Sequence, residues 1–468
     1  MRFKSSYWNL KRKLKGLKLE EENGEDLQYI PADPMEFAVK LFGFKPTSYQ
    51  EKLLRDQSKR IVVRMCRQAG KTTTIALRAI WFAVTHPKTL SLIVAPSLRQ
   101  SMIMMDRVHG FLMSLPQELR RSIVMKLQRT VVWFKNGSQI VALPCSVHLL
   151  RGYTAHQVLM DEVAFFRDDE TVIYNVVYPM LSTTDGVLIM SSTPWGKDSV
   201  FYRACQDPGY SKHVVTWRDV VNSGLIKPEF IEEMRRILPS ERFKREFEAE
   251  FVEEEDSYFK QDLIAKCIDP ELEYYEFDSY PSGEFYIGVD FGKYYDYSAI
   301  VVVERSGEVL KVVHCYRFPL GESYASVIGY VKTLCERWKD VQKVYADQTG
   351  VGNYIVEDMK NVSIPVDGIT FTTRLKEEML GYLKNMMENG FLKIPYDPEL
   401  ISEINVEKFS LTKDGHVIFY HPEGSHDDRL MALALGVYAS KSPPVSVGGV
   451  RKIMGVFSRR REKNVSRR

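Results

Sequence analysis

Short apolar runs alternate with longer amphipathic segments between Pro46 and about Phe251. Because a helix between two strands carries the chain back to pair in parallel, this alternation predicts βαβ units and a largely parallel sheet. The expected strands are Ile61 to Met65, Ser91 to Ala95, Gln157 to Val163, Gly186 to Ser192 and His213 to Trp217. The other expected elements are the helices Thr72 to Val84 and Leu98 to Ser114, and a hairpin, Val131 to Leu143, that turns at Asn136-Gly137.

The second half of the chain has a different order of elements. Arg242 to Asp256 is dense in Glu, Lys and Phe and predicts a helix or helical linker, with a domain boundary near residues 255 to 280. The strand Phe285 to Phe291 is then followed by a strand pair and a helix, an order that indicates a mixed sheet. The remaining expected elements are the strands Ser298 to Glu304, Val309 to Tyr316 and Lys343 to Asp347, and a final apolar helix, Asp428 to Ser440.

The length and composition limit the class of protein. At 468 residues the chain is about three times the usual single-domain length, which predicts two or three compact units. No stretch of about 18 uninterrupted apolar residues is present, so we do not expect a membrane protein. No apolar segment follows the basic N-terminus, which argues against a secretory signal and favours the cytoplasm. The six cysteines lie far apart without a CxxC pair, so we expect reduced, structural thiols.

Positive charge gathers at both ends of the chain, although a net charge of +3 is too small to indicate nucleic-acid binding by itself. The final segment carries one acid, Glu462, against a set of basic residues. These are Arg451, Lys452, Arg459, Arg460, Arg461, Lys463, Arg467 and Arg468. Such a tail is either disordered and solvated or a mobile arm that binds phosphates, and its composition leaves both readings open.

A Gly-Lys-Thr sequence follows the first predicted strand and opens the next helix, which is where a phosphate-binding loop must lie. Backbone N–H groups at the helix start can face phosphate oxygens, Lys71 can reach the β and γ phosphates, and the Thr72 hydroxyl can ligate Mg²⁺. The segment departs from the GxxxxGK[ST] pattern because Met65 takes the place of the first glycine. The residues predicted to bind nucleotide here are Arg67, Gln68, Ala69, Gly70, Lys71, Thr72 and Thr73.

Two adjacent acids, Asp161 and Glu162, end an apolar strand about ninety residues after this loop. This is a Walker B arrangement, in which Asp161 holds Mg²⁺ through water and Glu162 orients or deprotonates the attacking water. An isolated acid pair at a strand end is more often a solvated turn. The preceding Gly-Lys-Thr sequence and the α/β pattern make the catalytic reading the better one.

Two further groups of polar residues lie beside the same predicted strands. Ser191-Ser192-Thr193-Pro194 ends the strand that follows Asp161, so its hydroxyls can sense the γ-phosphate, or can simply form a turn. Tyr49-Gln50 precedes the first strand and can stack on and hydrogen-bond an adenine, with a buried structural tyrosine as the alternative.

Acids recur at the ends of predicted elements in the second half. Asp290 lies in the buried strand pattern Ile287 to Gly292, Asp347 ends another strand, and Asp427-Asp428 open the last helix. A buried carboxylate is costly unless it is paired or binds a cation. Three such acids can converge to hold two Mg²⁺ or Mn²⁺ ions about 4 Å apart for phosphodiester hydrolysis. Taken singly, Asp427 or Asp428 can equally be a helix cap.

These patterns together resemble the large terminase subunit of tailed phages and related viruses. The residues that carry the resemblance are Tyr49-Gln50, Arg67 to Thr72, Asn136-Gly137-Ser138, Arg151-Gly152, Asp161-Glu162 and Ser192-Thr193-Pro194. In that family the first glycine of the loop is often absent, so Met65 is no defect. The resemblance implies that Gln50 belongs to an adenine-reading motif and that Ser192 and Thr193 form a coupling motif. It also implies that Arg67 acts on the phosphates, where a guanidinium neutralises developing charge, with a plain surface arginine as the alternative.

The second half resembles the RNase H-like nuclease domain that terminases share with Holliday-junction resolvases. This resemblance implies that Asp290, Asp347 and Asp428 are metal ligands, with Asp427 and Asp296 as helpers. Resolvases often place another Asp one helical turn after the acid that opens the helix, and this chain has Met431 there. Asp427 therefore substitutes for that ligand, or one metal binds weakly.

The implied fold is α/β, with a RecA-like P-loop ATPase domain on a mostly parallel sheet followed by an RNase H-like nuclease domain on a mixed sheet. The predicted division is a basic N-terminal extension, 1–44; the ATPase domain, 45–255; a linker, 256–280; the nuclease domain, 281–440; and a basic C-terminal tail, 441–468.

The resemblance implies a viral genome-packaging enzyme. It would hydrolyse ATP to translocate double-stranded DNA into a procapsid and would cleave concatemeric DNA with a metal-dependent endonuclease. The implied cofactors are ATP and Mg²⁺, with Mn²⁺ as an alternative in the nuclease site. The implied partners are double-stranded DNA, the portal protein of the procapsid, the small terminase subunit and further copies of the chain in a ring, with no membrane. The expected location is the host cytoplasm, with transient docking on the procapsid and absence from the mature virion.

Two other functions compete with this one. A helicase, or a resolvase-type nuclease fused to a translocase outside packaging, would share the ATPase motifs, but a helicase should carry a second RecA-like lobe in place of the acids. A DNA-binding adaptor that uses nucleotide only as a switch would not need Glu162, because a switch requires phosphate binding without water activation.

Overall fold

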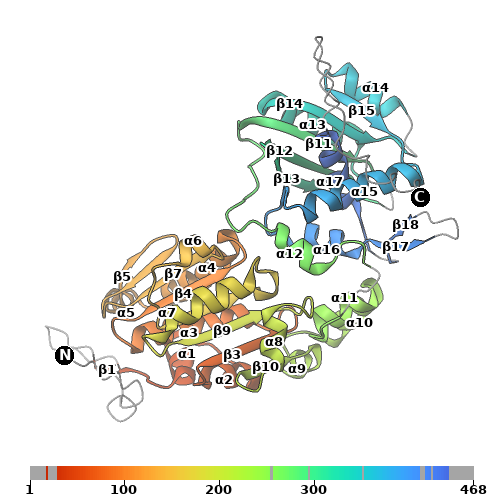
Figure 1. The fold of residues 1–468 in the computed structure, drawn as a ribbon. Coiled ribbons are helices and arrows are strands. Elements are labelled where there is room, and N and C mark those ends of the chain that lie inside the picture. Colours follow the sequence, from red (N-terminus) through yellow and green to blue (C-terminus); the bar gives the residue numbers. More distant parts are fainter. Residues whose placement is uncertain are drawn as a thin grey trace, which may run out of the picture.

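The computed structural model of the chain describes residues 17–18, 29–252, 257–292, 296–349, 353–411, 417–422 and 425–441. Within these residues the chain forms two bodies, each built on its own large sheet with helices around it (Figure 1). Of the predicted N-terminal extension, 1–44, the structure describes residues 17–18 and 29–44, in which the short strand β1, Leu17–Lys18, pairs with β2, Tyr29–Ile30; of the predicted tail, 441–468, it describes only residue 441. Among the helices described, none is long and apolar enough to cross a membrane.

The first sheet has eight strands in the order β10-β3-β9-β8-β4-β7-β6-β5, and only β6 and β5 join it antiparallel. The strands are β3, Arg60–Met65; β4, Leu90–Ala95; β5, Val124–Leu127; β6, Val131–Phe134; β7, Gln139–Pro144; β8, Gln157–Asp161; β9, Val187–Ser192; and β10, Ser211–Val215. Every residue of β8 and β9 is buried, as in a parallel sheet that is covered on both faces. The predicted mostly parallel α/β domain is confirmed.

Helices surround this sheet. They are α1, Pro34–Phe42; α2, Ser48–Arg55; α3, Lys71–Thr85; α4, Leu98–Ser114; α5, Gln117–Ile123; α6, Val147–Leu150; η3, Thr171–Val177; α7, Tyr178–Ser182; α8, Val200–Gln206; α9, Trp217–Asn222; α10, Pro228–Ile237; and α11, Ser240–Phe247. Asp33 and Ser97 cap α1 and α4 by accepting backbone N–H groups of the first turn. α1 lies within the predicted extension 1–44, yet it buries Phe37 and Ala38 and packs on α2 and α3. The division of the chain into domains stays a prediction.

Three elements end at least two residues earlier than their sequence patterns indicate. β10 ends at Val215 and not at Trp217, because Thr216 caps α9, which begins at Trp217. β8 ends at Asp161 and not at Val163, because Glu162 has φ 53° and a 3-10 helix, η2, Val163–Phe165, follows it. α11 ends at Phe247, well before Asp256, and Ala249 has φ 54° soon afterwards. A non-glycine residue with positive φ lies in the left-handed region, which continues neither a strand nor a right-handed helix.

The second sheet has six strands in the order β15-β14-β11-β12-β13-β16, and its directions are mixed. Its central strand, β11, pairs in parallel with β14 and antiparallel with β12. The strands are β11, Ser282–Asp290; β12, Ala299–Ser306; β13, Val309–Arg317; β14, Lys339–Asp347; β15, Val366–Ile369; and β16, Leu392–Lys393, with a separate antiparallel pair, β17, Lys408–Leu411, and β18, Val417–Tyr420. The predicted mixed sheet is confirmed.

The last helix, α17, Asp428–Ala439, lies directly against the middle of this sheet and contacts β11 and β12. The approach is so close that a Cβ at Gly288 would lie 1.9 Å from the Ala432 carbonyl oxygen and 2.4 Å from the Gly436 nitrogen. Only glycine fits there, and the sequence patterns did not reveal this requirement. The other helices are α12, Gln261–Cys267; α13, Tyr324–Arg337; α14, Asn353–Asn361; α15, Thr373–Glu388; and α16, Pro398–Val406.

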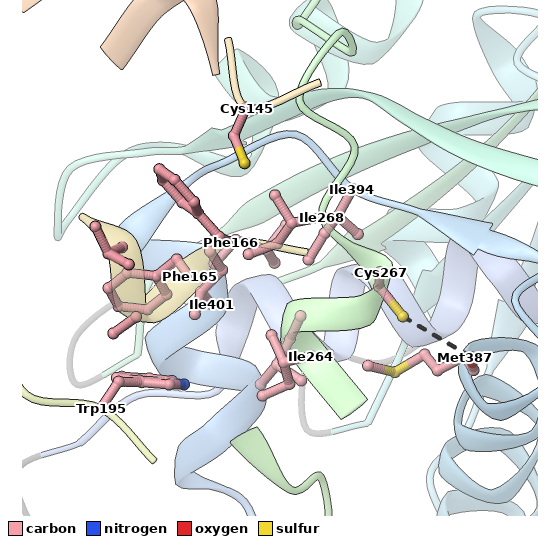
Figure 2. Close-up of a cluster of buried hydrophobic side chains, with 14 of the residues drawn as sticks. Cys145, Phe165, Phe166, Trp195, Ile264, Cys267, Ile268, Met387, Ile394 and Ile401 are labelled. Carbon is pink, nitrogen blue, oxygen red and sulfur yellow. Dashed lines mark hydrogen bonds between the residues drawn. The ribbon is translucent and has the colours of Figure 1, made fainter. Parts of the chain in front are cut away.

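A buried cluster of apolar side chains joins the two bodies (Figure 2). Its members in that view include Cys145, Phe165, Phe166 and Trp195 from the first body and Ile264, Cys267, Ile268, Met387, Ile394 and Ile401 from the second. α12, which lies within the predicted linker 256–280, contributes Ile264 and Cys267 and packs on α15 and α16. The segment between the two sheets is thus partly helical and contributes to the interface.

Replacing Gly288 with alanine is expected to lower the midpoint of thermal unfolding, Tm, because the new Cβ overlaps the backbone of α17. Overpacking a core costs about 1–3 kcal/mol, and contact with backbone atoms places this variant at the upper end. Gly329→Ala is the matched control, because Gly329 lies within α13 and a Cβ there meets nothing within 4 Å. The control should be neutral or stabilise the protein by up to about 1 kcal/mol. A Gly288→Ala variant that unfolds with the wild-type Tm in calorimetry would contradict this packing.

Candidate active sites

The loop between β3 and α3 has the conformation that phosphate binding requires. Gly70 has φ 77° and directly precedes α3, whose N-terminus has no side-chain cap. The first backbone N–H groups of α3 therefore remain available to an anion, and the helix dipole favours negative charge there. The predicted residues from Arg67 to Thr73 all line one cavity of about 340 Å³ at this point.

Gln50 contacts the phosphate-binding loop through its side-chain amide. Its side chain is buried, its Oε1 accepts a hydrogen bond from the Thr47 backbone N–H at 2.9 Å, and its Nε2 donates to the Ala69 carbonyl at 3.4 Å. A Cβ at position 70 would lie 2.4 Å from Gln50 Nε2, so another residue there would displace this amide, and the positive φ of Gly70 also favours glycine. Gln50 was predicted to read an adenine. That role stays a prediction, and the contacts of its amide in this structure are with the protein.

Lys71 lies between the two acids that were predicted to complete the site. Its Nζ is 3.2 Å from Asp161 Oδ1 and 3.0 Å from Glu162 Oε1, and its side chain is 11% exposed. Burial lowers the pKa of Lys71, but the charges of Asp161 and Glu162 outweigh burial and raise it above its usual value. Thr72 Oγ1 lies 3.4 Å from Asp161 Oδ2. The structure thus brings together the lysine, the threonine and both acids.

The hydroxyls that end β9 hold these acids. The parallel register pairs Asp161 with Ser191, whose Oγ donates to Asp161 Oδ1 at 2.7 Å. Ser192 Oγ donates to Glu162 Oε2 at 3.1 Å, and Thr193 Oγ1 donates to the same oxygen at 3.4 Å. Ser192 and Thr193, the predicted coupling pair, therefore contact the predicted general base.

Arg67 makes an ion pair with Glu246 of α11, and its backbone N–H donates to the Glu246 carbonyl at 2.9 Å. The Arg67 side chain is about half exposed and lines the same cavity. Its predicted action on phosphates stays a prediction. Glu246 lies in no motif, and only the tertiary structure places it here.

Asp290, Asp347 and Asp428 come together at one edge of the second sheet. β11 and β14 are parallel and pair Val289 with Ala346, so Asp290 and Asp347 follow side by side at their carboxyl ends. Desolvation and the charge of Asp347 raise the pKa of Asp290 well above its usual value, with further contributions from Asp427, Asp428 and Asp296. Desolvation also raises the pKa of Asp347. These four carboxylates therefore lie close enough to Asp290 for their negative charges to disfavour its ionised form.

Asp428 reaches this edge from the start of α17. Its Oδ1 accepts the Tyr297 backbone N–H at 3.1 Å, while its buried Oδ2 accepts no hydrogen bond from any residue that the structure describes. Burial, followed by the charges of Glu403, Asp427 and Asp296, raises the pKa of Asp428 to about 7. His426 Nδ1 lies 3.9 Å from this Oδ2, which is beyond hydrogen-bond distance, so the buried oxygen is available to a cation.

The two predicted helpers differ in their surroundings. Asp427 faces Lys376, whose Nζ is 3.5 Å from its Oδ2, and His421, whose Nδ1 is 3.6 Å from its Oδ1. Burial raises the pKa of Asp427, but these two partners outweigh burial and lower it. Glu407 belongs to the same group, because its Oε1 lies 3.0 Å from Lys376 Nζ. The ammonium of Lys376 therefore already balances part of the negative charge of Asp427 and Glu407. Asp296 is exposed and near enough to raise the pKa values of Asp290 and Asp428.

Both sites have residues that suit a divalent metal, but the negative charge of their acids is balanced differently. In the first site Lys71 balances one of the two negative charges of Asp161 and Glu162, and nucleotide-bound Mg²⁺ would meet Thr72 and Asp161. In the second site Asp290, Asp347 and Asp428 have raised pKa values, and no described lysine or arginine is paired with any of the three. Hard oxygen ligands with uncompensated negative charge favour Mg²⁺ or a similar ion. The assignment of individual ligands stays a prediction.

Comparison with known proteins identifies both halves. The family model described as terminase large subunit, T4likevirus-type, N-terminal, matches residues 65–266, and the model of the terminase RNase H-like domain matches residues 287–439. The large terminase subunit of Thermus phage G20c is 25% identical over 451 residues, which cover 86% of this chain and 89% of that protein. The terminase ATPase subunit of Escherichia phage P2 is 24% identical over 260 residues, 52% of this chain and 42% of that protein.

Solved structures of large terminases are also similar. The ATPase domain from Thermus phage P74-26 is 25% identical, with a TM-score of 0.42, and the match covers 46% of this chain and 98% of that one. The magnesium-bound nuclease from phage G20c is 25% identical, with a TM-score of 0.35, and the match covers 40% of this chain and 98% of that one. The large terminase of bacteriophage HK97 is 14% identical, with a TM-score of 0.39, and the match covers 85% of this chain and 95% of that one.

Without divalent metal, the stability of the protein is expected to fall as the pH rises from about 4 to 7. In this window folded Asp428, with a pKa of about 7, keeps a proton that the unfolded chain has released, so deprotonation favours unfolding. Asp428→Asn should weaken this dependence, to which the raised pKa values of Asp290 and Asp347 also contribute, and stabilise the metal-free protein at pH 8 by roughly 3 kcal/mol. Added Mg²⁺ should raise the Tm of the wild type more than that of the variant.

The matched control for this experiment is Asp367→Asn, because Asp367 is exposed on β15. It should keep the wild-type response to pH and Mg²⁺ in calorimetry. If Asp428→Asn gave the same pH profile and the same Mg²⁺ response as the wild type, Asp428 would not be the buried acid that the metal relieves.

Proposed function

The chain belongs to the large terminase subunits of phages, which carry an ATPase and a nuclease, and from that premise we propose how its two sites work in DNA packaging. The ATPase hydrolyses ATP to translocate double-stranded DNA into a procapsid, and the nuclease cuts concatemeric DNA with divalent metal. The proposal rests on the contrast between the two sites: in one body an acid pair shares a lysine beside a phosphate loop, and in the other body acids converge without a lysine or arginine among their described ion pairs.

At the ATPase site, the chain supplies binding and proton transfer. The amides at the start of α3 bind phosphate oxygens, and Lys71 turns from the acids to the β and γ phosphates when ATP enters. Glu162, released from Lys71, orients the attacking water and accepts its proton. Ser192 and Thr193 hold Glu162 Oε2 and thus carry its movement into β9. Arg67 leaves Glu246 to face the charge that develops on the transferred phosphoryl group.

At the nuclease site, Asp290, Asp347 and Asp428 would hold two Mg²⁺ ions, with Mn²⁺ as a substitute and with Asp296 and Asp427 in support. Such ions activate water and stabilise the charge of the cleaved phosphodiester. The side chains of this chain determine where the ions bind. The parallel pair β11 and β14 presents two acids, and the contact of α17 with Gly288 presents the third.

The partners follow from the packaging role. We propose double-stranded DNA as the substrate, with the portal protein and the small terminase subunit as partners, and a ring of copies of the chain while it is docked on the procapsid in the host cytoplasm. A helicase fits less well, because the second body carries a mixed sheet with an acid cluster where a helicase would have a second RecA-like sheet. A resolvase outside packaging does not account for the matches to terminases along both halves.

Glu162→Gln is expected to lower the rate of ATP hydrolysis by at least about 10²-fold, because the amide cannot accept the proton of water. Nucleotide binding should persist, since the amide oxygen can still accept from Ser192 and Thr193. Phosphate release and titration with a fluorescent ATP analogue measure the two properties. Glu170→Gln is the control, because Glu170 is exposed and pairs with Arg203 at the surface. Hydrolysis by Glu162→Gln at the wild-type rate would exclude Glu162 as the base.

Asp290→Asn is expected to reduce Mg²⁺-dependent cleavage of plasmid DNA by at least about 10²-fold, because the site loses a metal-binding carboxylate. ATP turnover should stay within about twofold of the wild type, since the acid lies in the other body. Asp278→Asn, an exposed acid of the second body, is the matched control and should cleave normally. Cleavage by Asp290→Asn at the wild-type rate would remove the nuclease assignment.

A further inference from the structure

The wall of the ATP cavity is built from both bodies. Most of its lining comes from the phosphate loop, α4 and the ends of β8 and β9, but Tyr396, Pro398 and Ser402 come from the second body. Pro398 and Ser402 belong to α16, and Tyr396 lies two residues before it. The position of the nuclease half therefore decides whether this wall is present.

Tyr396 lies close to the acids of the ATPase site. Its ring packs edge-on against Phe165 with the centroids 5.3 Å apart, and Phe165 lies three residues after Glu162. Burial raises the pKa of Tyr396 well above its usual value, and the charges of Glu162 and Asp161 add to this effect while Arg67 opposes it. The Tyr396 hydroxyl is thus within electrostatic reach of Glu162 and keeps its proton at neutral pH, which makes it a hydrogen-bond donor.

α16 holds Tyr396 in place. Asp397 caps the helix by accepting the Glu399 and Leu400 backbone N–H groups, and its Oδ2 accepts the Tyr274 hydroxyl at 2.9 Å. Ile401 is buried in the cluster that joins the two bodies (Figure 2). Further along, Glu403 accepts from Arg429 Nη1 at 2.6 Å, and Arg429 directly follows the metal-site acid Asp428. One helix therefore connects the ATP cavity to the start of α17.

We propose, on the basis of the ATPase function proposed above, that Tyr396 is a positioning residue for ATP hydrolysis that the nuclease half supplies. When Lys71 turns to the phosphates of ATP, Glu162 Oε1 loses its partner at 3.0 Å, and the Tyr396 hydroxyl donates to the carboxylate in its place. This hydrogen bond keeps Glu162 aimed at the attacking water. The ATPase site is complete only while the two bodies are docked, so displacement of the nuclease half slows ATP turnover.

The test compares ATP hydrolysis by the full chain with Tyr396→Phe, which keeps the ring and removes the hydroxyl. The kcat is expected to fall about tenfold, because one hydrogen bond to a charged group is lost in the reacting complex. The KM for ATP should stay within about twofold, since the hydroxyl acts on Glu162 and not on the nucleotide. Tyr354→Phe is the matched control, because Tyr354 is an exposed tyrosine of the same half.

A double-mutant cycle separates positioning from a structural effect. In a Glu162→Gln background, Tyr396→Phe should change the residual kcat by less than about twofold, because the carboxylate that it positions is already gone. The same tenfold loss in that background would overturn the proposal, as would a wild-type kcat for Tyr396→Phe or a loss confined to KM. A wild-type chain that hydrolyses no ATP would instead refute the ATPase function itself.

Discussion

Both sites depend on carboxylates that gather near the carboxyl ends of parallel strands and are largely shielded from water, where charge is costly unless something neutralises it. In the first body, Lys71 from the phosphate loop lies against Asp161 and Glu162 and makes the acid pair tolerable before any ligand arrives. In the second body, the pKa values of Asp290, Asp347 and Asp428 are all raised, and the described part of the chain brings no lysine or arginine to them. The acids of the ATPase site are therefore already balanced in part by a lysine of the same body, whereas the acids of the nuclease site would gain stability from a bound metal.

The contact between the two bodies lies directly after the acid pair Asp161 and Glu162 in the chain. The left-handed conformation of Glu162 ends β8 and starts η2, which carries Phe165 into the apolar cluster with Ile268, Ile394 and Ile401. Glu162 is thus close in sequence to side chains that pack against the nuclease half. Helix α16 also contacts the start of α17, where its Glu403 accepts a hydrogen bond from Arg429. Packed interiors transmit small displacements because they cannot deform continuously. α16 thus lines the ATP cavity and also contacts, through Glu403, the residue that follows Asp428.

Much of the fold was predictable, because strand and helix periods and the Gly-Lys-Thr sequence are local signals. The mostly parallel first sheet, the mixed second sheet and the hairpin at Asn136-Gly137 all agree with their patterns. The pattern was wrong by two residues at the end of β8, since an apolar run does not reveal that Glu162 adopts a positive φ. The reach of α11 was also overestimated, because its charge pattern continues past the point where Ala249 leaves the helical region.

The sequence by itself determined which residue types would meet at each strand end: Lys71 and Thr72 with Asp161 and Glu162, and the three acids Asp290, Asp347 and Asp428. Parallel strands end at a common edge, so local motifs predict the meeting of the strand-end residues, whereas the packing of α17 on the sheet brings Asp428 to Asp290 and Asp347. Only the tertiary structure decided that Glu246 pairs with Arg67, that Gly288 admits α17, and that Tyr396 lines the ATP cavity. These contacts join segments far apart in the chain through packing, and packing depends on the shape of both surfaces, which no local pattern contains.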